Sequence, residues 1–165
     1  MARTALIVCV LEAEAVVGEI RLVRDRSSSL GVPAHVTVLF PFADSDDIDE
    51  DALAELFATY PAFDFVLDRI ERWDNGIVWL HPEPSALFQE LTSAVCRRWP
   101  DYPPYGGTTD VVIPHVTVSE TPIELELDLP IAAQVCEVTL IQEQTDGNWA
   151  TRQVFRLGGP THPAG

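Results

Sequence analysis

The chain has 165 residues, of which 10 are basic and 26 acidic, and its formal net charge is −16. This length suits one domain and is short for two, and an apolar fraction of 47% is typical of a soluble globular protein. The negative charge excludes tight binding of duplex nucleic acid, which depends on Lys and Arg contacts to phosphates, and no stretch approaches the ~20 apolar residues of a membrane helix.

The cysteines and the N-terminus favour a cytoplasmic protein. Cys9, Cys96 and Cys136 lie in apolar segments, and their number is odd and their spacing unlike that of metal ligands, so we expect reduced thiols. The apolar run at residues 4–11 continues into acidic residues without a cleavage-site pattern, so it predicts a first strand and not a signal peptide. We expect a monomer with no membrane contact.

The first part of the chain predicts a strand, a helix and a second strand. Residues 4–11 form a dense apolar run, typical of a buried strand. Residues 13–26 predict an amphipathic helix, and a breaker with serines, Gly31 and Pro33 separates it from a strand at residues 35–40. The residues expected on the buried face of that helix are Val16, Val17, Ile20 and Val23.

The rest of the chain predicts further short strands and helices. The acidic stretch 44–51 suits a loop and a helix N-terminus, where negative charge is favoured. Asp74-Asn75-Gly76 and Asp146-Gly147 are strong hairpin turns. In chain order the expected elements are a helix at 52–57, strands at 63–67 and 77–80, a helix after Pro84, a Pro/Gly/Tyr-rich loop at 100–109, a strand at 112–119, and a hairpin of strands 134–144 and 149–157.

The order of these elements repeats. Residues of about 4–72 and about 77–143 each run strand, helix, loop, motif strand, which suggests two interleaved lobes related by a pseudo-two-fold axis. We expect residues 1–159 to form a single domain of the α+β or mixed α/β class and residues 160–165 to form a flexible tail.

The string His-Val-Thr-Val occurs twice, at residues 35–38 (the first motif) and 115–118 (the second motif). Alternate side chains of a strand share a face, so each copy offers an imidazole and a hydroxyl side by side above two valines. A single histidine on a strand is more often structural than catalytic. Two copies at matching places of a repeat favour a functional pair, with His35 and His115 facing each other across one cleft.

These residue types suit the cleavage of a phosphate ester. Histidine titrates near neutral pH, so one imidazole can accept a proton from water while the other donates a proton to the departing oxygen. The hydroxyls of Thr37 and Thr117 can donate hydrogen bonds to phosphate oxygens. This chemistry requires no metal and no other cofactor, and the sequence alone leaves open which histidine is the base.

The paired motifs resemble those of the 2H phosphoesterase superfamily, which includes the bacterial 2′-5′ RNA ligase (LigT-like) proteins and cyclic phosphodiesterases. The similarity covers about residues 4–159, and the strings at 31–42 and 103–107 look like the bacterial 2′-5′ RNA ligase branch. The resemblance implies an α+β bilobal fold, with two pseudo-symmetric antiparallel-rich sheets, helices on the outside and a central cleft. It also implies that His35 and His115 are the acid–base pair and that Thr37 and Thr117 hold the phosphate.

Three further residues are candidates for substrate binding, each with a plainer alternative. Tyr105, in the loop before the second motif, could stack on a base or touch phosphate, or could be an ordered loop aromatic. Phe42 could form a cleft wall or belong to the core, and Arg152 could reach the site or lie on the surface. The four tryptophans are interpreted as core or hairpin packing, and His81 and His162 as surface residues.

The sequence therefore predicts an enzyme that hydrolyses, or reversibly ligates, 2′,3′-cyclic phosphates or 2′-5′ phosphodiesters of a small nucleotide or RNA end. Few basic residues lie near either motif, which favours a small substrate. Two alternatives stay open: a non-catalytic nucleotide-binding or regulatory module on the same fold, and an enzyme that joins RNA ends.

Overall fold

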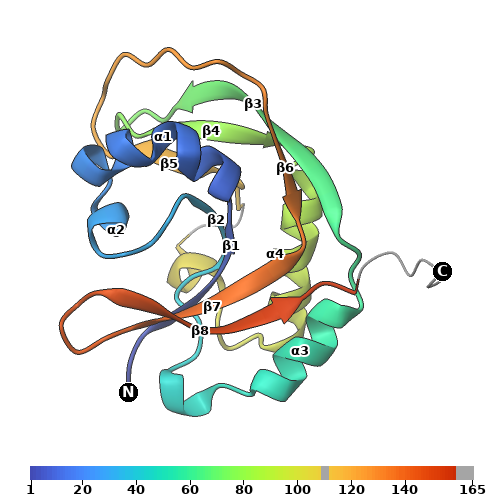
Figure 1. Cartoon of the computed structure of the whole chain (residues 1–165). Helices are drawn as coiled ribbons and strands as arrows, with labels where there is room; N and C mark the ends of the chain where they lie inside the picture. Colours follow the sequence, from blue (N-terminus) through green and yellow to red (C-terminus); the bar gives the residue numbers. More distant parts are fainter. Residues whose placement is uncertain (109–111, 159–165) are drawn as a thin grey trace.

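The computed structural model describes residues 1–108 and 112–158, and its centre is one curved antiparallel sheet (Figure 1). Eight strands follow the order β6-β3-β4-β5-β2-β1-β7-β8. Their bounds are β1 Thr4–Cys9, β2 His35–Leu39, β3 Phe63–Arg72, β4 Val78–Glu83, β5 Val116–Ser119, β6 Ile131–Val135, β7 Glu137–Glu143 and β8 Trp149–Arg156.

The sheet consists of two four-stranded halves, each with one motif strand at its inner edge. The first-motif half contains β2, β1, β7 and β8, and the second-motif half contains β5, β4, β3 and β6. The halves meet where Val36 of β2 pairs with Val116 of β5. The structure thus has the predicted α+β fold, and the two expected sheets are joined edge to edge because the motif strands pair with each other.

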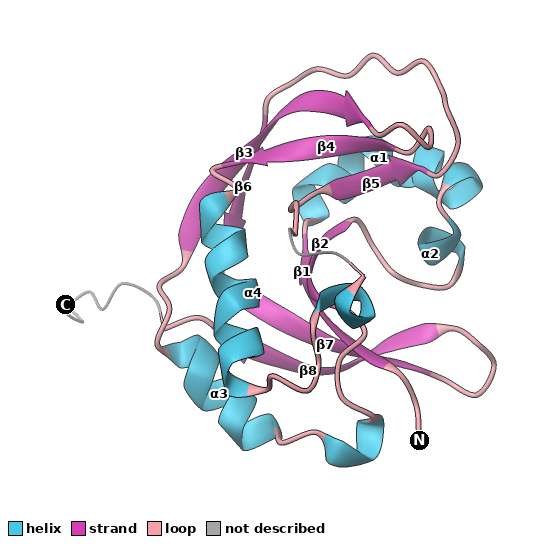
Figure 2. Ribbon diagram, turned by 180° about the vertical axis from the view of Figure 1, so that it is seen from behind, coloured by secondary structure: helices cyan, strands magenta, loops and turns pink. Residues whose placement is uncertain are grey.

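The two longest helices each contact the half of the sheet that does not contain the strand before them (Figures 1 and 2), and α4 also packs on β3 of its own half through Phe88. Helix α1 follows β1 and contacts β5 and β6, whereas α4 follows β4 and contacts β2. The helices are α1 Leu11–Arg24, α2 Arg26–Ser29, α3 Glu50–Ala58 and α4 Ala86–Arg98, with 3₁₀ turns η1 Ser45–Asp47 and η2 Pro104–Gly107.

The predicted buried face of α1 was partly wrong. Val16 and Val23 are 44% and 80% exposed, and the face that packs on the sheet carries Ala13, Val17 and Arg21. Apolar periodicity does not predict a buried face that contains Arg21, because Arg21 is charged. Its charge is satisfied by buried hydrogen bonds and not by solvent. The short helix α2 also lies within the predicted breaker, with Asp25 accepting a hydrogen bond from the Ser27 amide at its start.

The single strand expected at residues 134–144 is divided. It breaks at Cys136, so that β6 pairs with β3 in the second-motif half and β7 pairs with β1 in the first-motif half. The chain therefore crosses from one half to the other at this residue. The hairpin between β7 and β8 forms as predicted, and the tail expected at residues 160–165 lies outside the described residues.

The core lies between the sheet and the helices. Val36, Val38, Val116 and Val118, the apolar sides of both motifs, belong to one buried cluster with α1, α3 and α4. No helix in the described ranges is long and apolar enough to cross a membrane. The three cysteines are free thiols, each partly buried.

Candidate active site

The structure brings the two motifs together at the seam between the halves. Because Val36 is opposite Val116 in an antiparallel pair, the same register carries His35 towards Thr117 and Thr37 towards His115. The valines are fully buried beneath the sheet, so alternation places both imidazoles and both hydroxyls on its other face, where all four are partly exposed. One small area of the sheet therefore holds two imidazoles and two hydroxyls.

Both imidazoles are held by the same kind of hydrogen bond. Nδ1 of His35 lies 2.8 Å from the Pro33 carbonyl oxygen, and Nδ1 of His115 lies 2.7 Å from the Ile113 carbonyl oxygen. A carbonyl oxygen only accepts, so each Nδ1 carries the proton and donates. Each Nε2 is then left for proton transfer, and the backbone two residues earlier fixes the ring orientation.

Burial lowers the pKa of both histidines, and it lowers that of His35 to about 4. Desolvation outweighs the hydrogen bonds to the backbone carbonyls, which by themselves raise the pKa values. His115 also lowers the pKa of His35 by its charge, which places the two rings within electrostatic reach of each other. Asp25 opposes the shift at both rings.

We expect the pKa of His35 to make the folded state less stable in mild acid. The unfolded chain takes up a proton at His35 near pH 6.5, whereas the folded chain does so only near pH 4, so stability falls as pH decreases through this window. Between pH 7 and pH 4.5 this histidine should account for about 2–3 kcal/mol. Urea unfolding at both pH values should show a smaller loss in His35→Gln than in the wild type. Equal losses would contradict the shift.

Tyr105 reaches the first motif from the loop before β5. Its amide donates to the Phe40 carbonyl oxygen at 2.6 Å, and its side chain shares a hydrogen bond with Thr37. Burial raises the pKa of Tyr105, so the phenol keeps its proton at neutral pH, and the hydrogen bond with Thr37 opposes this shift in part. Tyr105 has a left-handed backbone (φ 51°), which is uncommon for a bulky residue.

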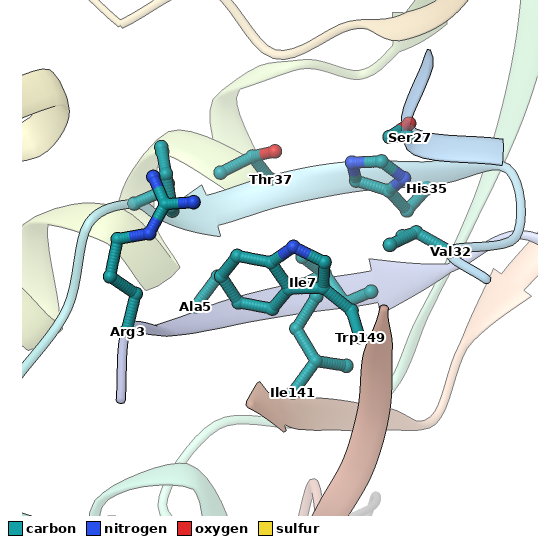
Figure 3. A pocket seen from close by; sticks show the side chains of 10 residues that line it. Arg3, Ala5, Ile7, Ser27, Val32, His35, Thr37, Ile141 and Trp149 are labelled. Atoms are coloured by element: carbon teal, nitrogen blue, oxygen red, sulfur yellow. The ribbon is translucent and has the colours of Figure 1, made fainter. Parts of the chain in front are cut away.

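An apolar pocket of about 240 Å³ borders the first motif (Figure 3). His35 and Thr37 form one side of it, and Trp149 of β8 stands across from them. The Trp149 indole packs edge-on against Phe40, with the Arg3 guanidinium 5.7 Å from its ring. The pocket is lined by Arg3, Ala5, Ile7, Ser27, Val32, His35, Thr37, Phe40, Ile141 and Trp149.

Arg3 and Trp149 were not predicted as site residues. Arg3 lines the pocket, but Glu143 binds it through two hydrogen bonds of 3.0 and 2.6 Å. Both residues lie far from the motifs in sequence, and only the pairing of β1 with β2 and β7 brings them there. The pocket therefore combines an aromatic wall with a guanidinium that is already paired.

Two tryptophans interpreted as packing residues adjoin the second motif. The rings of Trp73 and Trp79 lie 4.6 and 5.9 Å from that of His115, both edge-on. Trp79 is buried, and its Nε1 has no hydrogen-bond partner among the described residues. Trp73 and Trp79 lie on the two sides of the hairpin turn at residues 74–76, and their rings are 5.0 Å apart, so this turn was the sequence signal that could have placed them near each other.

Two of the predicted substrate-binding residues lie elsewhere. Phe42 is buried in the core and packs edge-on against Trp99 and Tyr102, so it forms no cleft wall. Arg152 is bound by Glu50 at 2.8 Å and by the Ser45 carbonyl oxygen, and it does not line the pocket. Both side chains are held by structural partners, which strand alternation alone does not reveal.

One side-chain cluster has ligand types that suit a metal. Within the described residues, one group of Asp68, His81 and Glu83 has ligand atoms within 4.8 Å of one another. His81 lies 3.0 Å from Asp68, whose other oxygen is 3.3 Å from Arg69, so a cation would compete with a guanidinium. His81 is largely covered at this position and is not the surface residue predicted from the sequence.

A family model confirms the relationship suggested by the motifs. Residues 9–147 match the model of the 2′-5′ RNA ligase superfamily. This range includes both motifs and β7, and it ends in the turn between β7 and β8. The chain belongs to the 2′-5′ RNA ligase superfamily. No curated protein sequence matches it significantly.

Solved structures of this superfamily's fold are similar over nearly the whole chain. E. coli LigT in complex with 3′-AMP has 17% identity and a TM-score of 0.66, with 94% of this chain and 98% of LigT covered. The protein TT0787 of Thermus thermophilus has 14% identity and a TM-score of 0.60, with 97% and 100% covered. At these identities the likeness shows the fold, and it agrees with the antiparallel curved sheet seen here.

Proposed function

We propose that this protein is a phosphodiesterase that opens 2′,3′-cyclic phosphates or cleaves 2′-5′ phosphodiesters of small nucleotides. The observation that carries the proposal is the matched pair of imidazoles, each fixed through Nδ1 by a backbone carbonyl with Nε2 left for proton transfer. A purely structural histidine has no need of a free ring nitrogen, and two such rings at one seam suit an acid and a base.

In this mechanism His35 is the general base and His115 the general acid. Nε2 of His35 takes a proton from water, whose oxygen attacks phosphorus, and Nε2–H of His115 gives a proton to the ribose oxygen as the phosphorus–oxygen bond breaks. The low pKa of His35 keeps it neutral at pH 7. A phosphate anion bound between the motifs raises the pKa of His115 towards neutrality and so favours its protonated form.

The hydroxyls of Thr37 and Thr117 hold the phosphate. Neutral donors suit this site, because Arg3 is already paired with Glu143 and the chain carries a net charge of −16. Tyr105 shares a hydrogen bond with Thr37 and so helps to fix the position of this hydroxyl. Such fixed donors stabilise the charge that develops on phosphorus-bound oxygens without reorganisation.

The pocket supports a small substrate with a planar organic group. Its volume of about 240 Å³ and its Trp149 wall suit one ring system beside the phosphate site. E. coli LigT, which has the same fold, has been crystallised with 3′-AMP, ATP and NADP+. By analogy we propose a small nucleotide as the ligand here, and the acidic surface argues against a large RNA.

A screen of nucleotides tests the proposal. We expect turnover of 2′,3′-cyclic nucleotides or 2′-5′-linked dinucleotides, equal with and without EDTA, because the two histidines supply both proton transfers. Product identification by chromatography would separate hydrolysis from ligation. Saturable binding of all compounds without product would favour the alternative of a non-catalytic nucleotide-binding module, and activity only on RNA ends would favour a ligase.

A further inference from the structure

Arg21 is the most completely buried charged residue in the described part of the chain, with an exposure of 0%. It lies on α1, at the face that packs on the sheet. Its guanidinium donates six hydrogen bonds of 3.0–3.2 Å, and two of them go to the buried carboxylate of Asp25. Both residues lie outside the two motifs and the pocket.

The other hydrogen bonds connect Arg21 to both halves of the site. Nε donates to the carbonyl oxygen of Thr117, within the second motif, at 3.2 Å. Nη1 donates to the carbonyl oxygen of Val32, three residues before His35, at 3.2 Å. Nη1 also donates to Glu14, which accepts a hydrogen bond from the Ala34 amide at 2.7 Å. A single guanidinium thus contacts the backbone that carries Thr117 and, directly and through Glu14, the segment that carries His35.

Asp25 completes the link. Its second oxygen accepts hydrogen bonds from the amide and the hydroxyl of Ser27, at 3.0 and 2.9 Å. Ser27 in turn borders the pocket beside His35 and accepts a hydrogen bond from Arg21 (Figure 3). Every oxygen of this carboxylate and every nitrogen of the guanidinium therefore has a partner.

We propose that Arg21 and Asp25 form a positioning pair, which fixes the separation of His35 and His115 by tying α1 to the segments that carry both motifs. This proposal rests on the proposed function. A buried ion pair contributes little net stability compared with apolar residues of similar volume, and Ala13 and Val17 show that this face accepts apolar residues. A network that spans both motifs is better explained by the precision it gives to their spacing.

Arg21 and Asp25 also change the pKa values of the imidazoles, and their effects on His35 are opposite in direction. Arg21 lowers the pKa of His35, and Asp25 raises the pKa values of both His35 and His115. Other titratable groups facing His35 come from each neighbouring element: Glu14 on α1, Cys9 opposite it on β1, His115 before β5, Tyr105 beside Thr37, and Arg3 across the pocket. These groups are the same in all the variants proposed below.

NMR titration of the histidine rings tests the pair without requiring turnover. We expect Arg21→Gln to raise the pKa of His35, and Asp25→Asn to lower the pKa values of both His35 and His115. Arg152→Gln is the matched control, because Arg152 is also bound by a carboxylate and a backbone carbonyl but lies away from the motifs. Its removal should leave both titrations unchanged. Unchanged titrations in the Arg21 and Asp25 variants would overturn the proposal.

Kinetics separate positioning from charge. We expect Arg21→Lys to lower kcat by about 100-fold with little change in KM, because an ammonium group keeps the charge but cannot contact both motif segments as the planar fork does. The pKa of His35 should stay near its wild-type value in this variant. Wild-type kcat in folded Arg21→Lys would refute the positioning role.

Two further outcomes need a separate interpretation: Arg21 variants that do not fold, and a wild type without turnover. If the Arg21 variants do not fold, Asp25→Asn tests the same pair, and its unaltered titrations would overturn the proposal. If the wild type turns over no nucleotide, the proposed function fails, whereas the titration of the two rings still decides whether the pair controls them.

Discussion

Replacement of either His35 or His115 by glutamine should lower kcat on a 2′,3′-cyclic nucleotide by about 10²–10⁴-fold, the usual contribution of one proton transfer. Glutamine keeps a polar side chain of similar length but cannot transfer a proton near neutral pH. KM should change little, because the threonine hydroxyls hold the phosphate. Steady-state assays at pH 7 check the result, with His81→Gln as a histidine control outside the motifs. Full activity in either motif variant would refute acid–base catalysis by the pair.

The two variants should differ on a substrate with a better leaving group. A nucleoside p-nitrophenyl phosphate releases an anion that needs no proton, so a variant lacking only the general acid should recover much of its activity. We therefore expect recovery in His115→Gln and not in His35→Gln. The reverse pattern would exchange the roles of the two histidines and leave the pair itself intact.

Loss of either threonine hydroxyl should lower kcat by about 10²–10³-fold, the usual effect of removing one donor to a developing anion. Thr37→Val and Thr117→Val keep the shape of the side chain and its strand preference, so the fold should persist. The measurement is kcat on the same cyclic nucleotide, together with inhibition by inorganic phosphate, which should weaken in both variants.

Serine variants provide the matched controls for the threonines. Thr37→Ser and Thr117→Ser keep the donor and lose only a methyl group, so they should keep most of the wild-type activity. Tyr105→Phe should reduce kcat less than Thr37→Val, because the Thr37 hydroxyl remains and loses only its hydrogen bond with the phenol. Equal activity in the valine and serine variants would show that the hydroxyls hold no phosphate.

The motifs could be predicted from the sequence because they combine two strong signals. Strand alternation fixes which side of residues 35–38 and 115–118 carries histidine and threonine, and the repeat places the copies at equivalent positions. The pairing of Val36 with Val116 then brings both copies to one face. The neighbours of the motifs were harder to predict. Trp149 joins the pocket through the β7–β8 hairpin and through the pairing of β7 with β1, whose residues are more than a hundred positions apart.

Arg21 shows why local patterns miss part of the site. The helical periodicity of α1 is apolar at Val16 and Val23, yet these residues face solvent, whereas the buried position carries a charge. The partners that make this burial possible, the carbonyl oxygens of Val32 and Thr117, belong to two separate segments. Helical periodicity cannot predict hydrogen bonds of this kind, because they form only when the separate segments have packed together.

The packing of α1 and α4 across the two halves of the sheet affects how the active site forms during folding. The strands of the second-motif half, β3 to β6, are consecutive in the chain. The first-motif half is complete only when β7 pairs with β1 and β8 pairs with β7. Because α1 packs on the opposite half and α4 packs on both halves, rotation of one half against the other would expose buried apolar surface. Contacts between such distant segments slow folding, because the cost of closing a long loop precedes them. The two imidazoles meet only when β2 pairs with β5, so the site depends on contacts between segments that are distant in the sequence.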